Sequence, residues 1–243
     1  MKFKNNVQSG FTLVEMAIVL VIFGLVLAAL LLPLRAQREQ AAQAQTVNAL
    51  DNAKQALLGF ALASGRLPCP ASLTSSGLED PTPATGACNA PAGFLPAATL
   101  GIQPMNSSGF AIDAWNNPIR YVVTSVNTSG GATTPDFTTQ DEMSRIGIAE
   151  LNPNIKVCAD SNSANCSATN YLIKNAVAVI FSTGANFGQS AGVDEASNLS
   201  ATTTFYSRAQ TASSGASTEF DDKVIWISPY VLYNAMIQAG QLH

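Results

Sequence analysis

The chain has 243 residues, 47% of them hydrophobic and only 12% charged, with a formal net charge of −4. Lysine and arginine are scattered singly after Arg38, so the sequence does not support nucleic-acid binding through a phosphate-neutralising patch. The only histidine is His243 and no cysteine pair has CxxC spacing, which argues against zinc. The sequence has neither a G-x-S-x-G motif nor a P-loop, so nothing in it supports an enzyme.

A short polar leader, MKFKNNVQSG at residues 1–10, precedes a long apolar stretch. Met16 to Leu32 contains no charged residue, which is close to the length that crosses about 30 Å of hydrocarbon. A secretory signal loses its apolar stretch on cleavage, whereas a cut after Gly10 would retain this one. We therefore expect residues 11–34 to form a single-pass membrane helix rather than a core helix.

The segment GFTLVEMAIVLVIFGLVLA resembles the N-terminus of type IV pilins and of the pseudopilins of type II secretion systems. The match lies at Gly10, Phe11, Thr12, Leu13 and Glu15. The resemblance implies that a prepilin peptidase/methyltransferase cuts after Gly10 and N-methylates Phe11. It implies a bacterial inner-membrane protein with a periplasmic globular domain, or a subunit of a periplasmic or extracellular filament. Its partners would be other pilin or pseudopilin subunits and an inner-membrane assembly platform.

Glu15 is a carboxylate within the apolar stretch, where a charged group costs roughly 2.5–3.5 kcal/mol on insertion scales. It therefore needs a partner. After cleavage that partner is the free amine of Phe11, which belongs either to the same chain or to a neighbouring filament subunit. In the second arrangement the ion pair would set the axial register of the subunits. In a third arrangement the carboxylate snorkels to the headgroups. The resemblance favours the neighbouring subunit, and hence a role for Glu15 in filament assembly.

The apolar periodicity resumes after Pro33 and predicts an amphipathic second half of the helix at residues 35–65. Pro33 itself removes one hydrogen bond and usually kinks a helix. Ser64 and Gly65 form a plausible stop. We expect one helix over Phe11–Ser64, about 80 Å long, whose second half packs on a globular domain at residues 66–243.

The four cysteines form two pairs that are close in sequence, Cys69 with Cys88 and Cys158 with Cys166. In an exported domain we expect two local disulfides, each closing a loop. Four cysteines allow three disulfide connectivities, and we choose this one because the paired cysteines are close in sequence. Four free buried thiols are the alternative.

The rest of the globular domain is predicted to be rich in β-strands. Six prolines make Arg66–Gln103 loop-like. We expect strands at Ile119–Val126, Arg145–Glu150, Ala176–Ser182 and Lys223–Ser228, a loop at Lys156–Asn170 and a short helix from Pro229. The sequence therefore predicts an α+β fold with an antiparallel sheet on the long helix, which agrees with the pilin-like fold that the resemblance implies.

Asp113, Trp115, Asn117, Pro118 and Tyr121 resemble the D-x-W-x-N-P-x-x-Y signature of major pseudopilins. The residue before Asn117 is usually glycine in that signature and is asparagine here, which tolerates left-handed backbone angles. Trp115 is either a ligand platform or a buried anchor of this turn against the helix. We expect the anchor, because large aromatic side chains mostly pack.

The segments GANFGQSAGVDEASNLS and EFDDK, which lie between the last two predicted strands, resemble the calcium loop of major pseudopilins. The candidate ligands are Asn186, Asp194 and Asp222, whose oxygen atoms suit calcium. Asn186 replaces an aspartate, and a long low-complexity stretch separates Asp194 from Asp222. A solvated acidic loop is the alternative.

The resemblance implies a structural prepilin-like subunit, a pseudopilin or a minor pilin, that assembles into a type IV pilus or a type II secretion pseudopilus. The alternative is a minor-pilin binding module or adhesin that contacts a surface, DNA or a protein through its disulfide-bearing loops. The presence of Glu15 argues against the tip of the filament, since tip subunits of this family often lack that glutamate.

Overall fold

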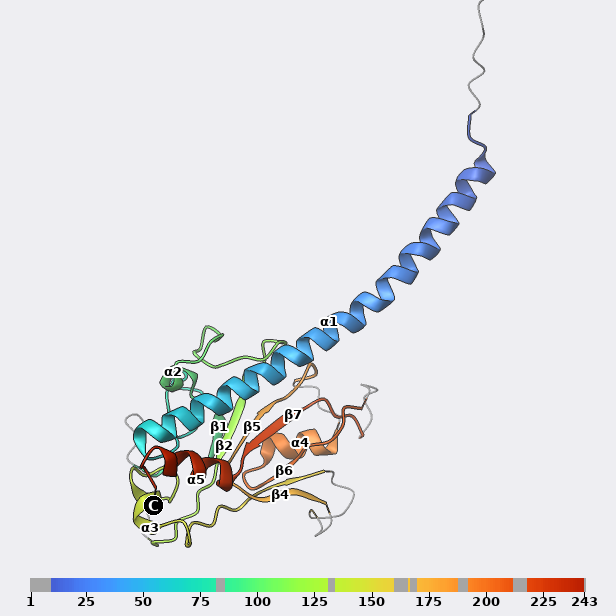
Figure 1. Cartoon of the computed structure of the whole chain (residues 1–243). Helices are drawn as coiled ribbons and strands as arrows, with labels where there is room; N and C mark the ends of the chain where they lie inside the picture. Colours follow the sequence, from blue (N-terminus) through green and yellow to red (C-terminus); the bar gives the residue numbers. More distant parts are fainter. Residues whose placement is uncertain are drawn as a thin grey trace, which may run out of the picture. The chain divides into compact units, whose positions relative to one another are not determined.

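The computed structural model describes residues 10–81, 86–130, 134–159, 166, 170–187, 192–211 and 218–242, and for residues 28–35 the backbone alone (Figure 1). The elements are α1 (Leu13–Ser64), β1 (Ala92–Phe94), α2 (Ala97–Leu100), β2 (Arg120–Val123), α3 (Glu142–Ile146), β3 (Ile155–Cys158), β4 (Tyr171–Ala176), β5 (Ala178–Ser182), α4 (Val193–Ser200), β6 (Thr204–Tyr206), β7 (Lys223–Ile227) and α5 (Pro229–Gln238). The chain divides into two compact units, Met1–Ala44 and Gln45–His243, and the boundary between them falls within the sequence of α1. The predicted leader, apart from Gly10, lies outside the described residues.

The long helix that the sequence predicts is confirmed. α1 runs without interruption from Leu13 to Ser64 and continues through Pro33. It ends at Gly65, whose φ of 69° is left-handed and whose amide donates to the carbonyl of Ala61 at 2.9 Å. Glycine adopts this conformation at little cost, so it stops the helix cleanly. No helix among the described residues is both long and apolar enough to cross a membrane.

A four-stranded antiparallel sheet, in the order β1-β2-β5-β7, forms the centre of the larger unit. Side chains alternate along β2, so Tyr121 and Val123 belong to one core cluster and Val122 to another. The first cluster also contains buried residues of α1 and α5, namely Leu50, Leu57, Ala61, Leu232 and Met236. The second half of α1 is therefore amphipathic, as predicted, and buries its apolar stripe on the sheet.

A second, three-stranded sheet has the order β4-β3-β6, with β3 antiparallel to β4 and parallel to β6. Its inward side chains share a core cluster with the other face of the first sheet, where the rings of Phe181 and Phe205 lie 5.8 Å apart. The α+β class with an antiparallel sheet is confirmed. The parallel pairing and the second sheet were not predicted, because strand pairing between distant segments leaves no local signal.

Three local predictions are wrong. Arg145–Glu150 is not a strand, because α3 occupies this region, with Arg145 paired to Glu142 one turn earlier and Gly147 after the last residue. Lys156–Asn170 is not all loop, since β3 extends to Cys158. The proline-rich segment contains β1, which forms because β2 supplies its hydrogen-bonding partner.

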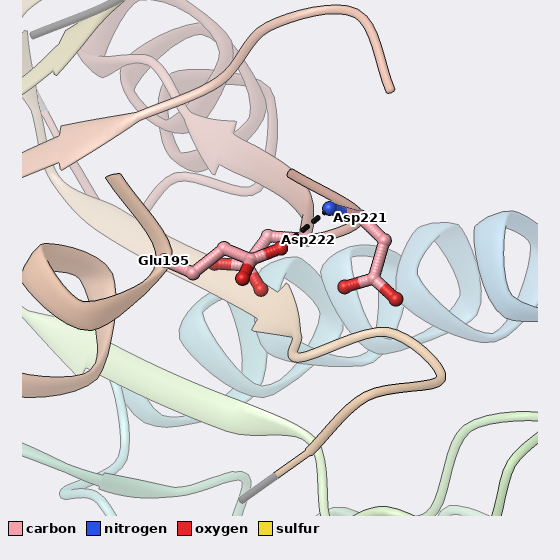
Figure 2. Close-up of side chains that lie close together, drawn as sticks. All are labelled: Glu195, Asp221 and Asp222. Carbon is pink, nitrogen blue, oxygen red and sulfur yellow. Dashed lines mark hydrogen bonds between the residues drawn. The ribbon is translucent and has the colours of Figure 1, made fainter. Parts of the chain in front are cut away.

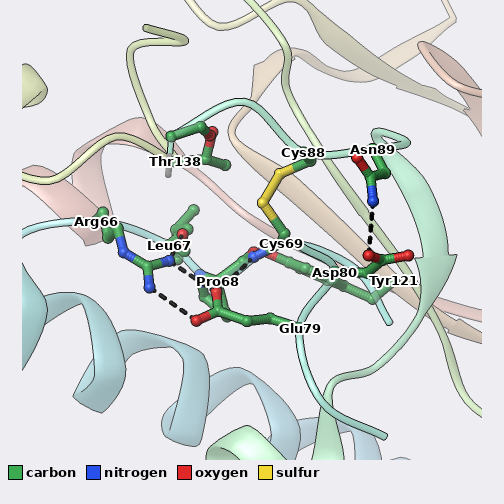
Figure 3. The surroundings of a disulfide bond; sticks show 11 residues. Arg66, Leu67, Pro68, Cys69, Glu79, Asp80, Cys88, Asn89, Tyr121 and Thr138 are labelled. Carbon is green, nitrogen blue, oxygen red and sulfur yellow. Dashed lines mark hydrogen bonds and ion pairs between the residues drawn. A yellow bond between two sulfur atoms is a disulfide. The ribbon is translucent and has the colours of Figure 1, made fainter. Parts of the chain in front are cut away.

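Both predicted disulfides are present, Cys69–Cys88 with Cα atoms 5.3 Å apart and Cys158–Cys166 with Cα atoms 5.8 Å apart. Figure 3 shows the first beside an ion pair of Arg66 with Glu79 at 2.8 Å. The backbone amide of Cys69 also donates to Glu79, at 3.2 Å. A covalent bond and a buried charge pair thus hold a segment whose composition provides little regular structure.

Candidate functional site

The first turn of α1 is closed by reciprocal hydrogen bonds between Thr12 and Glu15. The Thr12 amide and hydroxyl each donate to the Glu15 carboxylate at 2.9 Å, and the Glu15 amide donates to the Thr12 hydroxyl at 3.3 Å. This is a capping box, in which the N-cap and third helical residues satisfy each other's polar groups. The sequence analysis missed it, although T-x-x-E before an apolar run is its signature. Gly10 and Phe11 are exposed next to this turn.

The turn that follows Asp113 is organised by that residue's carboxylate. One of its oxygens accepts from the amides of Trp115 and Asn117, at 2.9 and 2.8 Å, and the other accepts from the hydroxyl of Ser182 at 2.6 Å. Asn116 has a φ of 65°, the left-handed conformation expected where glycine is usual. Burial raises the pKa of Asp113, while these hydrogen bonds act in the opposite direction.

Trp115 is only partly buried, so the expectation that it is the buried anchor of this turn is wrong. One contact of the turn with α1 is a hydrogen bond from the amide of Ala114 to the hydroxyl of buried Thr46 at 3.2 Å. The small polar Thr46 lets the turn approach the helix closely. The aromatic residue of the motif is thus not its anchor, and the aspartate orders the backbone.

Three carboxylates meet where α4 approaches the segment before β7. Glu195, Asp221 and Asp222 each place an oxygen within 4.8 Å of the others, and we call them the acidic cluster (Figure 2). Glu195 and Asp222 are 1% and 5% exposed. Glu195 lies in the first turn of α4, where a carboxylate is favoured. Asp221 is partly buried. Three negative charges this close together, two of them buried, repel one another strongly unless protons or a cation compensate them.

Donors surround the acidic cluster without neutralising it. The Asp221 amide donates to Glu195 at 2.7 Å, the Ala185 amide to Asp221 at 2.8 Å, and the Asn198 side chain to Asp222 at 2.8 Å. All three donors are uncharged. Burial, aided by the negative charge of Glu195, raises the pKa of Asp222 to about 7 and that of Asp221 to about 6. The cluster therefore holds protons near neutral pH when no cation is bound.

The structure separates the residues that the sequence grouped as ligands. Asp222 belongs to the acidic cluster. Asp194 instead forms an ion pair with Arg208, whose Nε lies 2.7 Å from its carboxylate. Asn186 donates its amide group to Glu195 and Glu219, at 3.3 and 3.1 Å, so it bridges two carboxylates as a donor.

Two members of the cluster, Glu195 and Asp221, were missed by sequence reasoning. Each is the immediate neighbour of a residue that was chosen, Asp194 or Asp222. Adjacent residues of a helix point about 100° apart, so only one of Asp194 and Glu195 can face the cluster. The D-E pair gave the position of the site but not the facing residue, which the packing of α4 decides, whereas both residues of the D-D pair belong to the cluster.

The acidic cluster fits a cation by its donor set. Its members are hard oxygen ligands from two separate segments, the kind that calcium prefers. The Oδ1 atom of Asp221 is buried and accepts no hydrogen bond from any residue that the structure describes. Gly184, with a φ of 67°, leaves the space that the Asp221 side chain occupies, and a Cβ there would collide with it.

Comparison with known proteins concerns the N-terminus alone. A family model described as the prokaryotic N-terminal methylation motif matches residues 5–31. Neither a curated protein nor a solved structure matches the chain significantly. The matched residues include the capped first turn of α1, with Thr12 and Glu15. The chain therefore carries the N-terminal signature of type IV pilins and pseudopilins.

Proposed function

We propose that this chain is a prepilin-like structural subunit whose leader is cut after Gly10 and whose Phe11 is then N-methylated. The observation that carries this proposal is the methylation motif at residues 5–31, placed at the very start of α1. Gly10 and Phe11 are exposed, as a protease substrate requires. Disulfides in the larger unit suit an oxidising compartment such as the periplasm.

After processing, residues 11–34 anchor the subunit in the inner membrane and later pack against other subunits in a filament. Apolar side chains of the first part of α1 are widely exposed, with Leu13 91% and Leu25 67% accessible. Such a surface is stable only in lipid or against other apolar helices. The Asp113 turn, which is similar to that of major pseudopilins, favours a secretion pseudopilus over an adhesive tip.

The processing proposal is tested by co-expressing the chain with a prepilin peptidase and sequencing the N-terminus by mass spectrometry. We expect a mature chain that begins at N-methylated Phe11. Gly10→Val puts a branched side chain next to the cut and should block processing. Gly24→Val is the matched control, because no atom lies within 4 Å of a Cβ at that position, and it should be processed normally. An uncut wild-type chain contradicts the proposal.

The assembly step is tested separately by incorporation into filaments. Both hydrogen bonds from Thr12 go to Oε2 of Glu15, so Oε1 can still accept from the amine of a neighbouring subunit. Glu15→Gln should be cleaved normally and incorporated poorly. Incorporation at the wild-type level would show that the charge of Glu15 does not select the register.

We also propose that the acidic cluster binds calcium. Glu195, Asp221 and Asp222 would hold the ion, and calcium would supply the positive charge that the surrounding donors lack. It would join α4 to the segment before β7 and so rigidify this end of the larger unit. The support is the proximity of three carboxylates, two of them buried, and the Oδ1 atom of Asp221, which is buried and has no hydrogen-bond partner among the described residues.

Thermal melts of the full chain in detergent, with calcium or with a chelator, test this proposal. Calcium should raise the melting temperature, and Asp221→Asn should remove the increase. Asp141→Asn is the matched control, since Asp141 is exposed and is not part of the cluster. An identical melting temperature with calcium and with chelator would contradict calcium binding while leaving the processing proposal untouched.

A further inference from the structure

A groove of about 240 Å³ lies where β1 and β2 meet the loop that contains Cys69. It is lined by residues of that loop and of both strands, among them Pro70, Leu73, Asp80, Ala92, Phe94 and Arg120. It lies far along the chain from the acidic cluster and shares no residue with it. The groove contains two features that indicate a ligand, an uncompensated guanidinium and an open strand edge.

The guanidinium is that of Arg120, the first residue of β2. Its carbon lies 4.6 Å from the centre of the Phe94 ring, and Phe94 packs on Phe110 with ring centres 4.5 Å apart. The Arg120 guanidinium forms no hydrogen bond or ion pair with any described residue, and its Nε atom is buried. A stacked, partly buried guanidinium in a fixed position is suited to bind a carboxylate through two parallel hydrogen bonds.

The strand edge belongs to β1. The Val123 amide donates to the carbonyl of Pro91 and the Leu95 amide donates to that of Ile119, so residues 91, 93 and 95 form hydrogen bonds with β2. The backbone groups of Ala92 and Phe94 therefore point away from β2, because these directions alternate in antiparallel pairs. Phe94 exchanges hydrogen bonds with Ala71 at 2.8 and 2.9 Å. Ala92 lines the groove, and its backbone amide and carbonyl form no hydrogen bond there with any residue that the structure describes.

Asp80 restricts what the groove can accept. Its carboxylate accepts from the side chain of Asn89 at 2.7 Å (Figure 3). Asp80 forms no ion pair with Arg120. A negative charge on the same groove disfavours phosphate or a run of acidic residues. An extended peptide with a single carboxylate can pair with the Arg120 guanidinium and form hydrogen bonds with the Ala92 backbone. It brings only one negative charge near Asp80, so the electrostatic repulsion is small.

We propose that this groove binds an extended segment of a partner protein that carries one acidic side chain. The segment pairs its backbone with Ala92 by β-strand addition and places its carboxylate on Arg120. The disulfide Cys69–Cys88 and the Arg66–Glu79 ion pair hold the groove in place before the ligand arrives, which lowers the entropy lost on binding. This site is independent of the filament role and of the acidic cluster.

The test uses the full chain in detergent micelles and two blocked peptides, Ac-Thr-Val-Glu-Val-NH2 and the same peptide with glutamine. Titration followed by NMR should shift the Ala92 amide and the Arg120 Nε–H resonance, with weak affinity for the glutamate peptide. Arg120→Gln should weaken binding about tenfold or more, since a charge-assisted pair is lost. Arg38→Gln, at an exposed arginine of α1, is the matched control and should bind normally.

The peptide with glutamine distinguishes charge recognition from general stickiness. The glutamine peptide should bind the wild-type protein about as weakly as the glutamate peptide binds Arg120→Gln. Binding of the glutamine peptide to Arg120→Gln should be little weaker than either, because both changes remove the same ion pair. Arg120→Lys should restore part of the affinity, which excludes misfolding as the cause. Equal binding of both peptides, or shifts that occur away from Ala92 and Arg120, would overturn the proposal.

Discussion

The side-chain amide of Asn117 donates to the carbonyl oxygen of Gly184 at 2.7 Å, joining the turn at residues 113–118 to the loop beside the acidic cluster. The same loop is held from the other side, where the Gly184 amide donates to Ser182 at 3.1 Å and Ser182 donates to Asp113. Gly184 in turn leaves room for the side chain of Asp221. The turn at residues 113–118 and the candidate calcium site are thus parts of one connected structure.

Gly184→Ala should destabilise the protein through two effects. The left-handed φ of 67° costs any other residue about 1–2 kcal/mol, and the new Cβ collides with Asp221. Gly101→Ala is the matched control, because Gly101 has a φ of 68° and open space around a Cβ. Urea unfolding should show Gly184→Ala losing about 2 kcal/mol more than the control. Equal losses would mean that Asp221 moves aside freely.

Asp194→Asn tests whether Asp194, which the sequence predicted as a calcium ligand, contributes to calcium binding by the acidic cluster. It removes the partner of Arg208 and leaves a largely buried guanidinium, for a loss of about 3 kcal/mol in unfolding free energy. The increase in melting temperature on adding calcium should remain, whereas Asp221→Asn should abolish it. If Asp194→Asn also abolishes the increase in melting temperature with calcium, Asp194 is a calcium ligand and must be added to the acidic cluster.

Stability without calcium should fall as the pH rises from about 4 to about 7. The pKa of Asp222 is raised from its ordinary value of 3.8 to about 7, chiefly by burial, so in this range the folded chain binds more protons than the unfolded chain. The free energy of unfolding then decreases by up to about 1.4 kcal/mol per pH unit for that group. Asp221 acts in the same direction, up to about pH 6.

This pH dependence is measured by urea unfolding with a chelator at several pH values between 4 and 7.5. Saturating calcium should flatten the curve, because the ion stabilises the charged carboxylates. Asp222→Asn should flatten it in the absence of calcium as well. If the stability of the wild-type protein in chelator rises with pH, the negative charges of the acidic cluster are already balanced without calcium.

Glu79→Gln should be strongly destabilising, because it leaves Arg66 charged and buried. The side chains of this ion pair are 12% and 10% exposed, and breaking a pair of this kind costs about 3–5 kcal/mol. Glu142→Gln breaks an ion pair in which Arg145 is 60% exposed and should have a far smaller effect. Chemical unfolding of both variants under oxidising conditions checks this contrast. Similar effects would mean that solvent reaches Arg66 freely.

Many elements of the fold can be predicted from local patterns of the sequence. The helix Leu13–Ser64, its stop at Gly65, the strands β5 and β7, and the helix that begins at Pro229 all follow from periodicity and from glycine and proline positions. Both disulfides follow from proximity along the chain. These features are predictable because each depends on interactions among residues that are close in sequence.

Tertiary structure decided what depends on pairing between distant segments. β1 exists because β2 provides its hydrogen bonds, and the parallel pairing of β3 with β6 joins segments more than forty residues apart. Whether Asp194 or Glu195 faces the acidic cluster is fixed by how α4 packs, since neighbouring helical residues point in different directions. The sequence by itself determined the N-terminal methylation motif, because it is read from contiguous residues. Only the fold decided which side chains converge, because that depends on the energy of packing the whole chain.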